Sequence, residues 1–175
     1  MLINGTQVPL AKVAFRKHRI YIADDVELLN PQSVNTVTIK FTNSYVNNSA
    51  GLHRSVDAKD GNIYIYSHLE PYNCHRWFPC FDQPSIRAPL KLTVITPPEA
   101  DWEVIANGKK EGAVSLNKLQ ILGQLEIDET VEGIVHSFEE SPPISTYIYG
   151  VMAGKFKRFA PEVPHPRIPM AVYTS

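Results

Sequence analysis

The feature that most constrains this chain is its series of short segments in which apolar and polar residues alternate, each closed by a turn signal. Val34 to Phe41 alternates most cleanly, which predicts a strand with Val37, Ile39 and Phe41 facing inward. Further strands are expected at residues 19–22, 63–69, 90–95, 102–106, 119–127, 147–156 and 170–173. Because helical periodicity is almost absent, the sequence predicts an all-β fold, either an antiparallel β-sandwich or a curled open sheet.

Turn and linker signals divide these segments. Lys59 to Asn62 contains a glycine where positive φ costs little, which predicts a hairpin-type turn, and Asn107-Gly108 is expected to close the strand before it. The nearly all-apolar Tyr147 to Phe156 suits a strand buried on both faces. Val163 to Pro169 predicts an extended linker into a further strand. The long strand expected at 119–127 would direct the side chains of Leu119, Ile121, Leu125 and Ile127 to one face. Gly123 interrupts that face and suggests a β-bulge.

The length of 175 residues allows a substantial core, and the composition excludes some partners. A formal net charge of −1 gives no reason to expect nucleic acid or an anionic membrane surface. The sequence has no apolar run long enough to span a bilayer and no basic region followed by an apolar stretch. We therefore expect a cytoplasmic protein with no nucleic-acid and no membrane partner.

The only two cysteines, Cys74 and Cys80, are separated by five residues. This spacing fits neither a zinc knuckle nor a redox C-x-x-C motif. Two reduced, half-buried thiols are the first interpretation, and a local disulfide is the alternative.

The candidate site lies where the strand beginning at Ile63 ends. Strand periodicity places Tyr64, Tyr66, His68 and Glu70 on one face, and Pro71 ends the ladder because it has no backbone N–H. A carboxylate at this position can accept the ammonium group of a ligand, with a hydrogen-bonding ring beside it. The alternative is that His68 and Glu70 are two solvated side chains on an exposed sheet face.

Other catalytic signatures are missing from the sequence, including H-E-x-x-H, G-x-S-x-G and a phosphate-binding glycine loop. Arg76 and Asp82 flank Phe-Pro-Cys-Phe and are expected to form a structural ion pair across a tight turn. Trp77, Phe78 and Phe81 are expected to fill the core beneath that turn.

The same stretch carries a family resemblance. Gly51-Leu52-His53-Arg54, Tyr64 to Pro71, and above all His75 to Pro84, with its run Phe-Pro-Cys-Phe-Asp-Gln-Pro, resemble the N-terminal domain of the aminopeptidase N family of zinc metallopeptidases. Puromycin-sensitive aminopeptidase and leukotriene A hydrolase belong to that family. The resemblance covers residues 8–175 and implies an all-β, antiparallel, saddle-shaped β-sandwich that packs against a catalytic domain. It places the N-terminal β-domain at residues 1–169 and the start of the absent catalytic domain at 170–175.

The resemblance also implies roles for the two candidate residues. The family presents a Thr-Gln-x-Glu-Pro strand end, in which Glu binds the free α-amino group of the substrate and Gln lines the pocket for the first side chain. Glu70 matches the Glu, His68 stands in place of the Gln, and Ser67 stands in place of the Thr. An imidazole can become cationic near neutral pH and would then repel the ammonium that Glu70 attracts. His68 is therefore neutral, or it marks altered specificity or lost activity.

Two functions follow as expectations. In the first, the chain is the N-terminal domain of a zinc-dependent aminopeptidase that removes N-terminal residues from peptides. It would bind the peptide N-terminus through Glu70 and His68, contribute no catalytic residue or metal ligand, and be inactive alone. The zinc would be held in the catalytic domain, where it would activate the attacking water. In the second, the chain is a non-catalytic binding or scaffold module of a larger assembly, and the sequence beyond Ser175 would distinguish the two.

Overall fold

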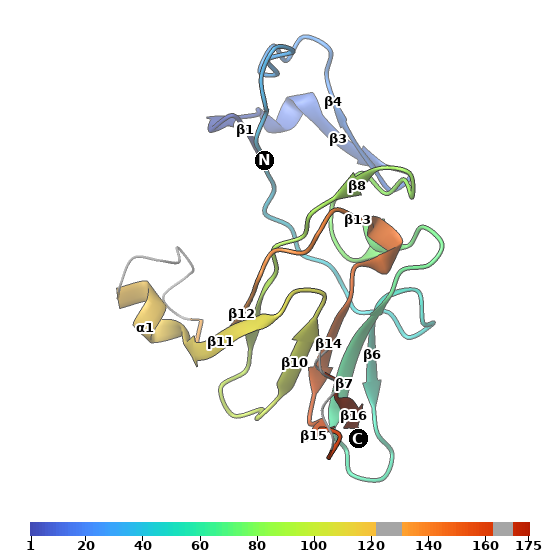
Figure 1. Cartoon of the computed structure of the whole chain (residues 1–175). Helices are drawn as coiled ribbons and strands as arrows, with labels where there is room; N and C mark the ends of the chain where they lie inside the picture. The colour runs from blue at the N-terminus through green and yellow to red at the C-terminus, as the bar shows by residue number, and fades with distance from the viewer. Residues whose placement is uncertain (122–130, 163–169) are drawn as a thin grey trace. The chain divides into compact units, whose positions relative to one another are not determined.

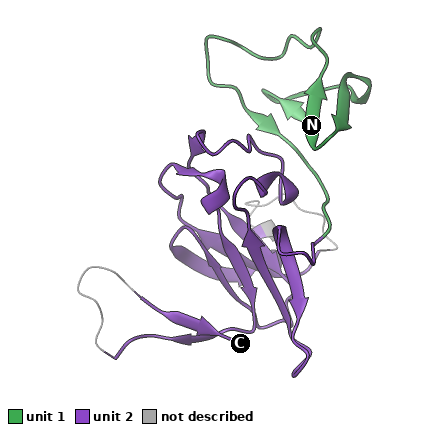
Figure 2. Ribbon diagram, turned by 90° about the vertical axis from the view of Figure 1, so that its right-hand side faces the viewer, with its two compact units in different colours: residues 1–44 green, residues 45–175 purple. Residues whose placement is uncertain are grey.

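The chain folds mainly into antiparallel β-strands, which confirms the all-β expectation. The computed structural model describes residues 1–121, 131–162 and 170–175 (Figure 1). These residues form two compact units, residues 1–44 and 45–175 (Figure 2). Within the described residues, no helix has the length and apolar character needed to cross a membrane.

Unit 1 consists of two small antiparallel sheets. The first has the strand order β2-β1-β5, and the second is a hairpin of β3 and β4. Lys17 and His18 connect β3 to β4 with φ angles of 50° and 59°, the positive values that a two-residue hairpin turn requires. The elements are β1 Leu2–Ile3, β2 Thr6–Gln7, the 3-10 helix η1 Leu10–Lys12, β3 Val13–Arg16, β4 Arg19–Ile22 and β5 Val37–Thr38.

The strand predicted at Val34 to Phe41 is wrong in extent and in burial. Only Val37–Thr38 pairs with a neighbour, and Val37 and Phe41 are 48% and 52% exposed. Alternation determines which side chains share a face, but burial needs an opposing layer. Among the 44 residues of unit 1, all of them described, only Ile3 and Val8 are buried, so this unit offers little core for the alternating face to join.

Unit 2 contains two larger antiparallel sheets. The four-stranded sheet has the order β10-β14-β7-β6, and its strands lie side by side in Figure 1. The three-stranded sheet has the order β11-β12-β9. Their strands are β6 Gly51–Val56, β7 Ile63–His68, β9 Thr93–Thr96, β10 Glu103–Ala106, β11 Lys110–Ser115, β12 Ile134–Phe138 and β14 Val151–Gly154. Two short pairs complete the unit, β8 Arg87–Ala88 with β13 Ile144–Ser145 and β15 Lys157–Phe159 with β16 Val172–Thr174.

One apolar cluster joins the two sheets. Ile65, Val104, Val151 and Ala153 come from the four-stranded sheet and pack with Phe138 of the three-stranded sheet. Phe138 is 1% exposed, and Leu92 and Val94 pack against the same cluster. This shared core makes unit 2 an antiparallel β-sandwich, as expected.

The structure confirms several predicted elements. Arg19–Ile22 is β4 with the expected bounds, and Lys59 to Asn62 connects β6 to β7 as an antiparallel hairpin. The chain also bends at Asn107-Gly108 after β10, but β10 and β11 belong to different sheets, so this bend carries the chain between the two layers. A Cβ on Gly108 would lie 1.9 Å from the Glu139 carbonyl oxygen, which explains why a glycine is needed there.

Two other strand predictions were wrong in part. Residues Leu116–Ile121 form the helix α1, so the strand expected from Leu119 does not begin there. The rest of that segment, including Gly123, Leu125 and Ile127, lies outside the described residues, as does the linker expected at 163–169. In Tyr147 to Phe156 only Val151–Gly154 is strand; Met152 is 39% exposed, so one face of β14 is not fully covered.

Candidate functional site

The expected site lies at the end of β7, a strand held on both sides. β14 and β6 pair with β7, and His68 stands opposite Gly51 in the β6 register. His68 and Glu70 are exposed, and Leu69 between them is 2% exposed. This exposed–buried–exposed alternation continues the strand pattern past the last paired residue. Leu69 therefore anchors the strand end in the core, with a solvent-accessible polar residue on each side of it.

His68 is oriented by its own chain. Its ring Nδ1 hydrogen-bonds the backbone carbonyl of Ser49. A carbonyl cannot donate, so Nδ1 carries a proton in this contact and Nε2 is the ring nitrogen that remains open. Ser49 is itself held, because its backbone N–H donates to Nδ1 of His53 at 3.3 Å, and His53 is 8% exposed.

Glu70 combines a restrained backbone with an open side chain. The Asn73 side-chain amide donates to the Glu70 carbonyl oxygen at 2.8 Å, and the Asn73 backbone N–H donates to the Leu69 carbonyl at 2.7 Å. The Glu70–Pro71 peptide bond is cis. Among the described residues, no hydrogen bond or ion pair involves the Glu70 carboxylate, which is therefore available to a ligand.

A second polar group lies immediately after this turn and centres on Asp82. One carboxylate oxygen accepts from the His75 backbone N–H at 3.0 Å and from His75 Nδ1 at 2.7 Å, and the other accepts from the Thr146 hydroxyl at 2.9 Å. Burial alone would raise the pKa of Asp82, but these hydrogen bonds outweigh it and lower the pKa below its ordinary value. The structure thus gives Asp82 a pairing partner in His75, where the sequence suggested Arg76.

The aromatic residues of the same turn do not all enter the core. Trp77 packs against both apolar clusters of unit 2, and Phe78 packs against the one formed by Leu69, Cys74 and Tyr149. Phe81, which was expected in the core, is instead 82% exposed. Both cysteines are free thiols, as the first interpretation held, with Cys74 buried and Cys80 half-buried.

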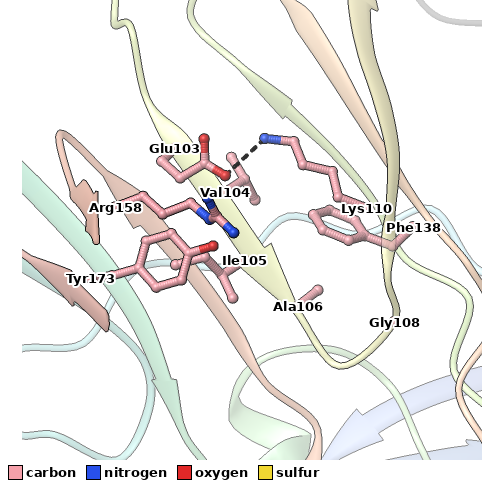
Figure 3. A pocket seen from close by; sticks show the side chains of 9 residues that line it. All are labelled: Glu103, Val104, Ile105, Ala106, Gly108, Lys110, Phe138, Arg158 and Tyr173. Carbon is pink, nitrogen blue, oxygen red and sulfur yellow. Dashed lines mark hydrogen bonds and ion pairs between the residues drawn. The ribbon is translucent and has the colours of Figure 1, made fainter. Parts of the chain in front are cut away.

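A separate pocket of about 290 Å³ lies where the two sheets of the sandwich meet β15 and β16 (Figure 3). In its lining, Lys110 Nζ lies 3.1 Å from Glu103 Oε1, and the Arg158 and Tyr173 side chains come from the β15–β16 pair. Apolar side chains of β10 and Phe138 line the rest. Neither His68 nor Glu70 contributes to it, so this pocket is distinct from the candidate site.

The residues present do not fit a zinc site. Among the described residues, no three His, Cys, Asp or Glu side chains are grouped so that they could hold a metal ion. At the β7 end, the exposed Glu70 carboxylate can accept hydrogen bonds from a cation or another donor.

Sequence reasoning assigned no role to two residues that make long-range hydrogen bonds in unit 2. Thr146 joins Asp82 across 64 positions. Asn107 accepts from the Gly150 backbone N–H at 2.6 Å and donates to the Ile148 carbonyl at 3.0 Å, which fixes the start of β14 beside β7. Only the asparagine had a signal in the sequence, and that signal concerned its local turn.

Comparisons with known proteins agree with this fold. The Peptidase M1 N-terminal domain family matches residues 3–148. Aminopeptidase M1-A of Oryza sativa subsp. japonica is 29% identical over 131 residues, which cover 72% of this chain and 13% of the relative. Probable M1 family aminopeptidase 1 of Encephalitozoon cuniculi is 29% identical over 160 residues, covering 89% of this chain and 16% of the relative. Aminopeptidase N of Streptomyces lividans is 29% identical over 113 residues, which cover 65% of this chain and 11% of the relative.

The chain thus spans between 11% and 16% of the length of these relatives. The match includes β7, the Asp82 turn and most of the sandwich. By its sequence and its all-β architecture, the chain belongs to the Peptidase M1 N-terminal domain family.

Proposed function

We propose that this chain is the N-terminal domain of a zinc-dependent aminopeptidase, and that Glu70 binds the α-ammonium group of a peptide substrate. The observation that carries the proposal is an exposed carboxylate with no partner among the described residues, held on a restrained backbone at the end of a central strand. A carboxylate facing an ammonium selects chain ends, because an internal peptide segment has no such charge. The family membership supports a peptide substrate.

His68 has a role compatible with this. With Nδ1 donating to the Ser49 carbonyl, the neutral ring has only Nε2 left, and Nε2 accepts hydrogen bonds. A neutral His68 does not repel an ammonium group, and its Nε2 can accept from one. We therefore propose that His68 lines the pocket for the first residue of the substrate.

The zinc and the bond-breaking residues belong, in this proposal, to a catalytic domain outside residues 1–169. Residues 170–175 would be its beginning. The relatives' greater length leaves room for such a domain. The isolated 175 residues should hydrolyse no aminoacyl substrate, and zinc-dependent cleavage by the purified chain would refute this.

A scaffold module is the second candidate, favoured by the presence of His68 where the family pattern has Gln. The natural coding sequence after Ser175 distinguishes the two. An H-E-x-x-H motif about a hundred or more residues downstream supports the enzyme. A stop near Ser175 supports the scaffold.

The direct test is Glu70→Gln in the complete enzyme, assayed on a peptide with a free N-terminus. Removing one partner of a desolvated charge pair costs about 3 kcal/mol, so kcat/KM should fall about a hundredfold. Glu99→Gln is the matched control, since Glu99 is also exposed but lies between β9 and β10, and it should leave kcat/KM unchanged. Equal kcat/KM in the wild type and Glu70→Gln, with both folded by circular dichroism, would remove Glu70 from the site.

A further inference from the structure

The turn that follows β7 brings the two thiols of the chain together. Cys74 begins the 3-10 helix η2 Cys74–Arg76 and is 0% exposed. The backbone N–H groups of Trp77 and Phe78 both donate to the Cys74 carbonyl, at 2.8 and 3.1 Å, so the chain turns back directly after Cys74. Cys80 then packs against the cluster that contains Cys74 and Leu69. Five intervening residues therefore separate the thiols in sequence but not in space.

The two sulfur atoms are not equivalent. The neighbouring Cys80 side chain, together with burial, raises the pKa of the Cys74 thiol. The same interaction lowers the pKa of Cys80, although burial and the negative charge of Asp82 oppose it. Cys80 is also the more accessible of the two, being half-buried where Cys74 is buried. Accessibility and thiolate character together make Cys80 the first thiol to react.

We propose that Cys74 and Cys80 form a reversible intramolecular disulfide by exchange with a small-molecule disulfide such as oxidised glutathione. The Cys80 thiolate attacks one sulfur of the oxidant, forms a mixed disulfide and releases one glutathione thiolate, which takes up a proton. Cys74 then loses its proton and attacks the Cys80 sulfur, and the second glutathione leaves as a thiol. Two protein thiols are oxidised, and one glutathione disulfide is reduced to two glutathione thiols.

This cross-link would close the turn between the candidate site and the Asp82 network. Leu69, which anchors the end of β7, packs in the same cluster as Cys74. The proposal does not depend on a substrate at Glu70, because its readout is the covalent state of the two sulfur atoms.

The experiment incubates the native 175-residue chain with oxidised glutathione, blocks remaining thiols with N-ethylmaleimide under denaturing conditions and measures the intact mass. The wild-type chain should be lighter by two hydrogen atoms and carry neither glutathione nor maleimide. Cys74→Ser should retain one glutathione, because the mixed disulfide at Cys80 has no second thiol to resolve it. Cys80→Ser should carry no glutathione and one maleimide, since the buried Cys74 does not react while the chain is folded.

Reduction with dithiothreitol should return two maleimide-reactive thiols to the oxidised wild type. Two outcomes would overturn the proposal. One is a wild-type chain that keeps glutathione on Cys80 as the Cys74→Ser variant does, which would mean that Cys74 cannot reach it. The other is a wild-type chain that keeps both thiols free in an excess of oxidised glutathione. If circular dichroism shows that the serine variants do not fold, tryptic mapping of the oxidised wild-type chain decides. Peptides that contain Cys74 and Cys80 linked by a disulfide support the proposal, and their absence overturns it.

Discussion

Replacing Asp82 by asparagine tests whether the turn after β7 depends on a buried charge. The carboxylate is 8% exposed and accepts three hydrogen bonds, two from His75 and one from Thr146. An asparagine can keep its oxygen toward Thr146, but its amide nitrogen then faces two N–H groups of His75 and cannot accept hydrogen bonds from them. Hydrogen bonds to a charged group contribute about 1.5–3 kcal/mol each, and their partial recovery by relaxation leaves an expected loss of about 3 kcal/mol.

Urea unfolding of the isolated chain measures this loss. With a denaturant dependence of about 2 kcal/mol/M, the midpoint should fall by about 1.5 M. Asp24→Asn is the matched control, because Asp24 is exposed in unit 1, and its free energy of unfolding should stay within about 0.5 kcal/mol of wild type. An Asp82→Asn chain as stable as Asp24→Asn would show that the network does not stabilise the fold.

The same variant tests the ionisation of Asp82. Because its pKa is lower in the folded chain than the ordinary 3.8, the carboxylate stabilises the fold above that pH, and this stabilisation is lost as pH falls through the folded value. Wild type and Asp82→Asn should therefore converge in stability on acidification below about pH 4. A constant difference down to about pH 2 would contradict the lowered pKa.

Three further predictions concern the sandwich. Phe138→Ala should lower the free energy of unfolding in urea by about 4 kcal/mol, because the Phe138 ring fills the core between the sheets. Phe81 is 82% exposed, so Phe81→Ala should change the free energy of unfolding by less than about 0.5 kcal/mol. Equal effects of the two substitutions would refute the assigned core. Burial lowers the pKa of His136 below the 6.5 of an ordinary imidazole, so the unfolded chain binds a proton more readily than the folded chain. The free energy of unfolding should therefore fall as pH drops below about 6.5. In His136→Leu this fall should be smaller. Gly51→Ala should lower the thermal midpoint of unfolding by several degrees. The φ angle of Gly51 is +97°, and the added Cβ would lie 2.8 Å from the Arg76 Cβ. An unchanged midpoint would contradict that geometry.

The candidate site shows how far sequence reasoning reaches. The period of β7 and the position of Pro71 were enough to place His68 and Glu70 at an exposed strand end. They could not show that His68 donates to Ser49, because that contact depends on how the loop before β6 folds back. The sequence also suggested Arg76, six positions away, as the partner of Asp82. In the structure Asp82 accepts hydrogen bonds from His75 and from the hydroxyl of Thr146, which lies 64 positions away.

The sequence by itself determined the all-β class, the strand at Arg19–Ile22, the hairpin before Ile63 and the family, because these depend on local alternation, turn residues and a continuous motif. Tertiary structure decided burial. Phe81 and Val37 have the side chains of core residues, yet both are exposed, whereas Phe138 is buried because a second sheet covers it. Alternation tells which side chains point the same way along a strand, and only the packing of another layer against that face decides whether they leave water.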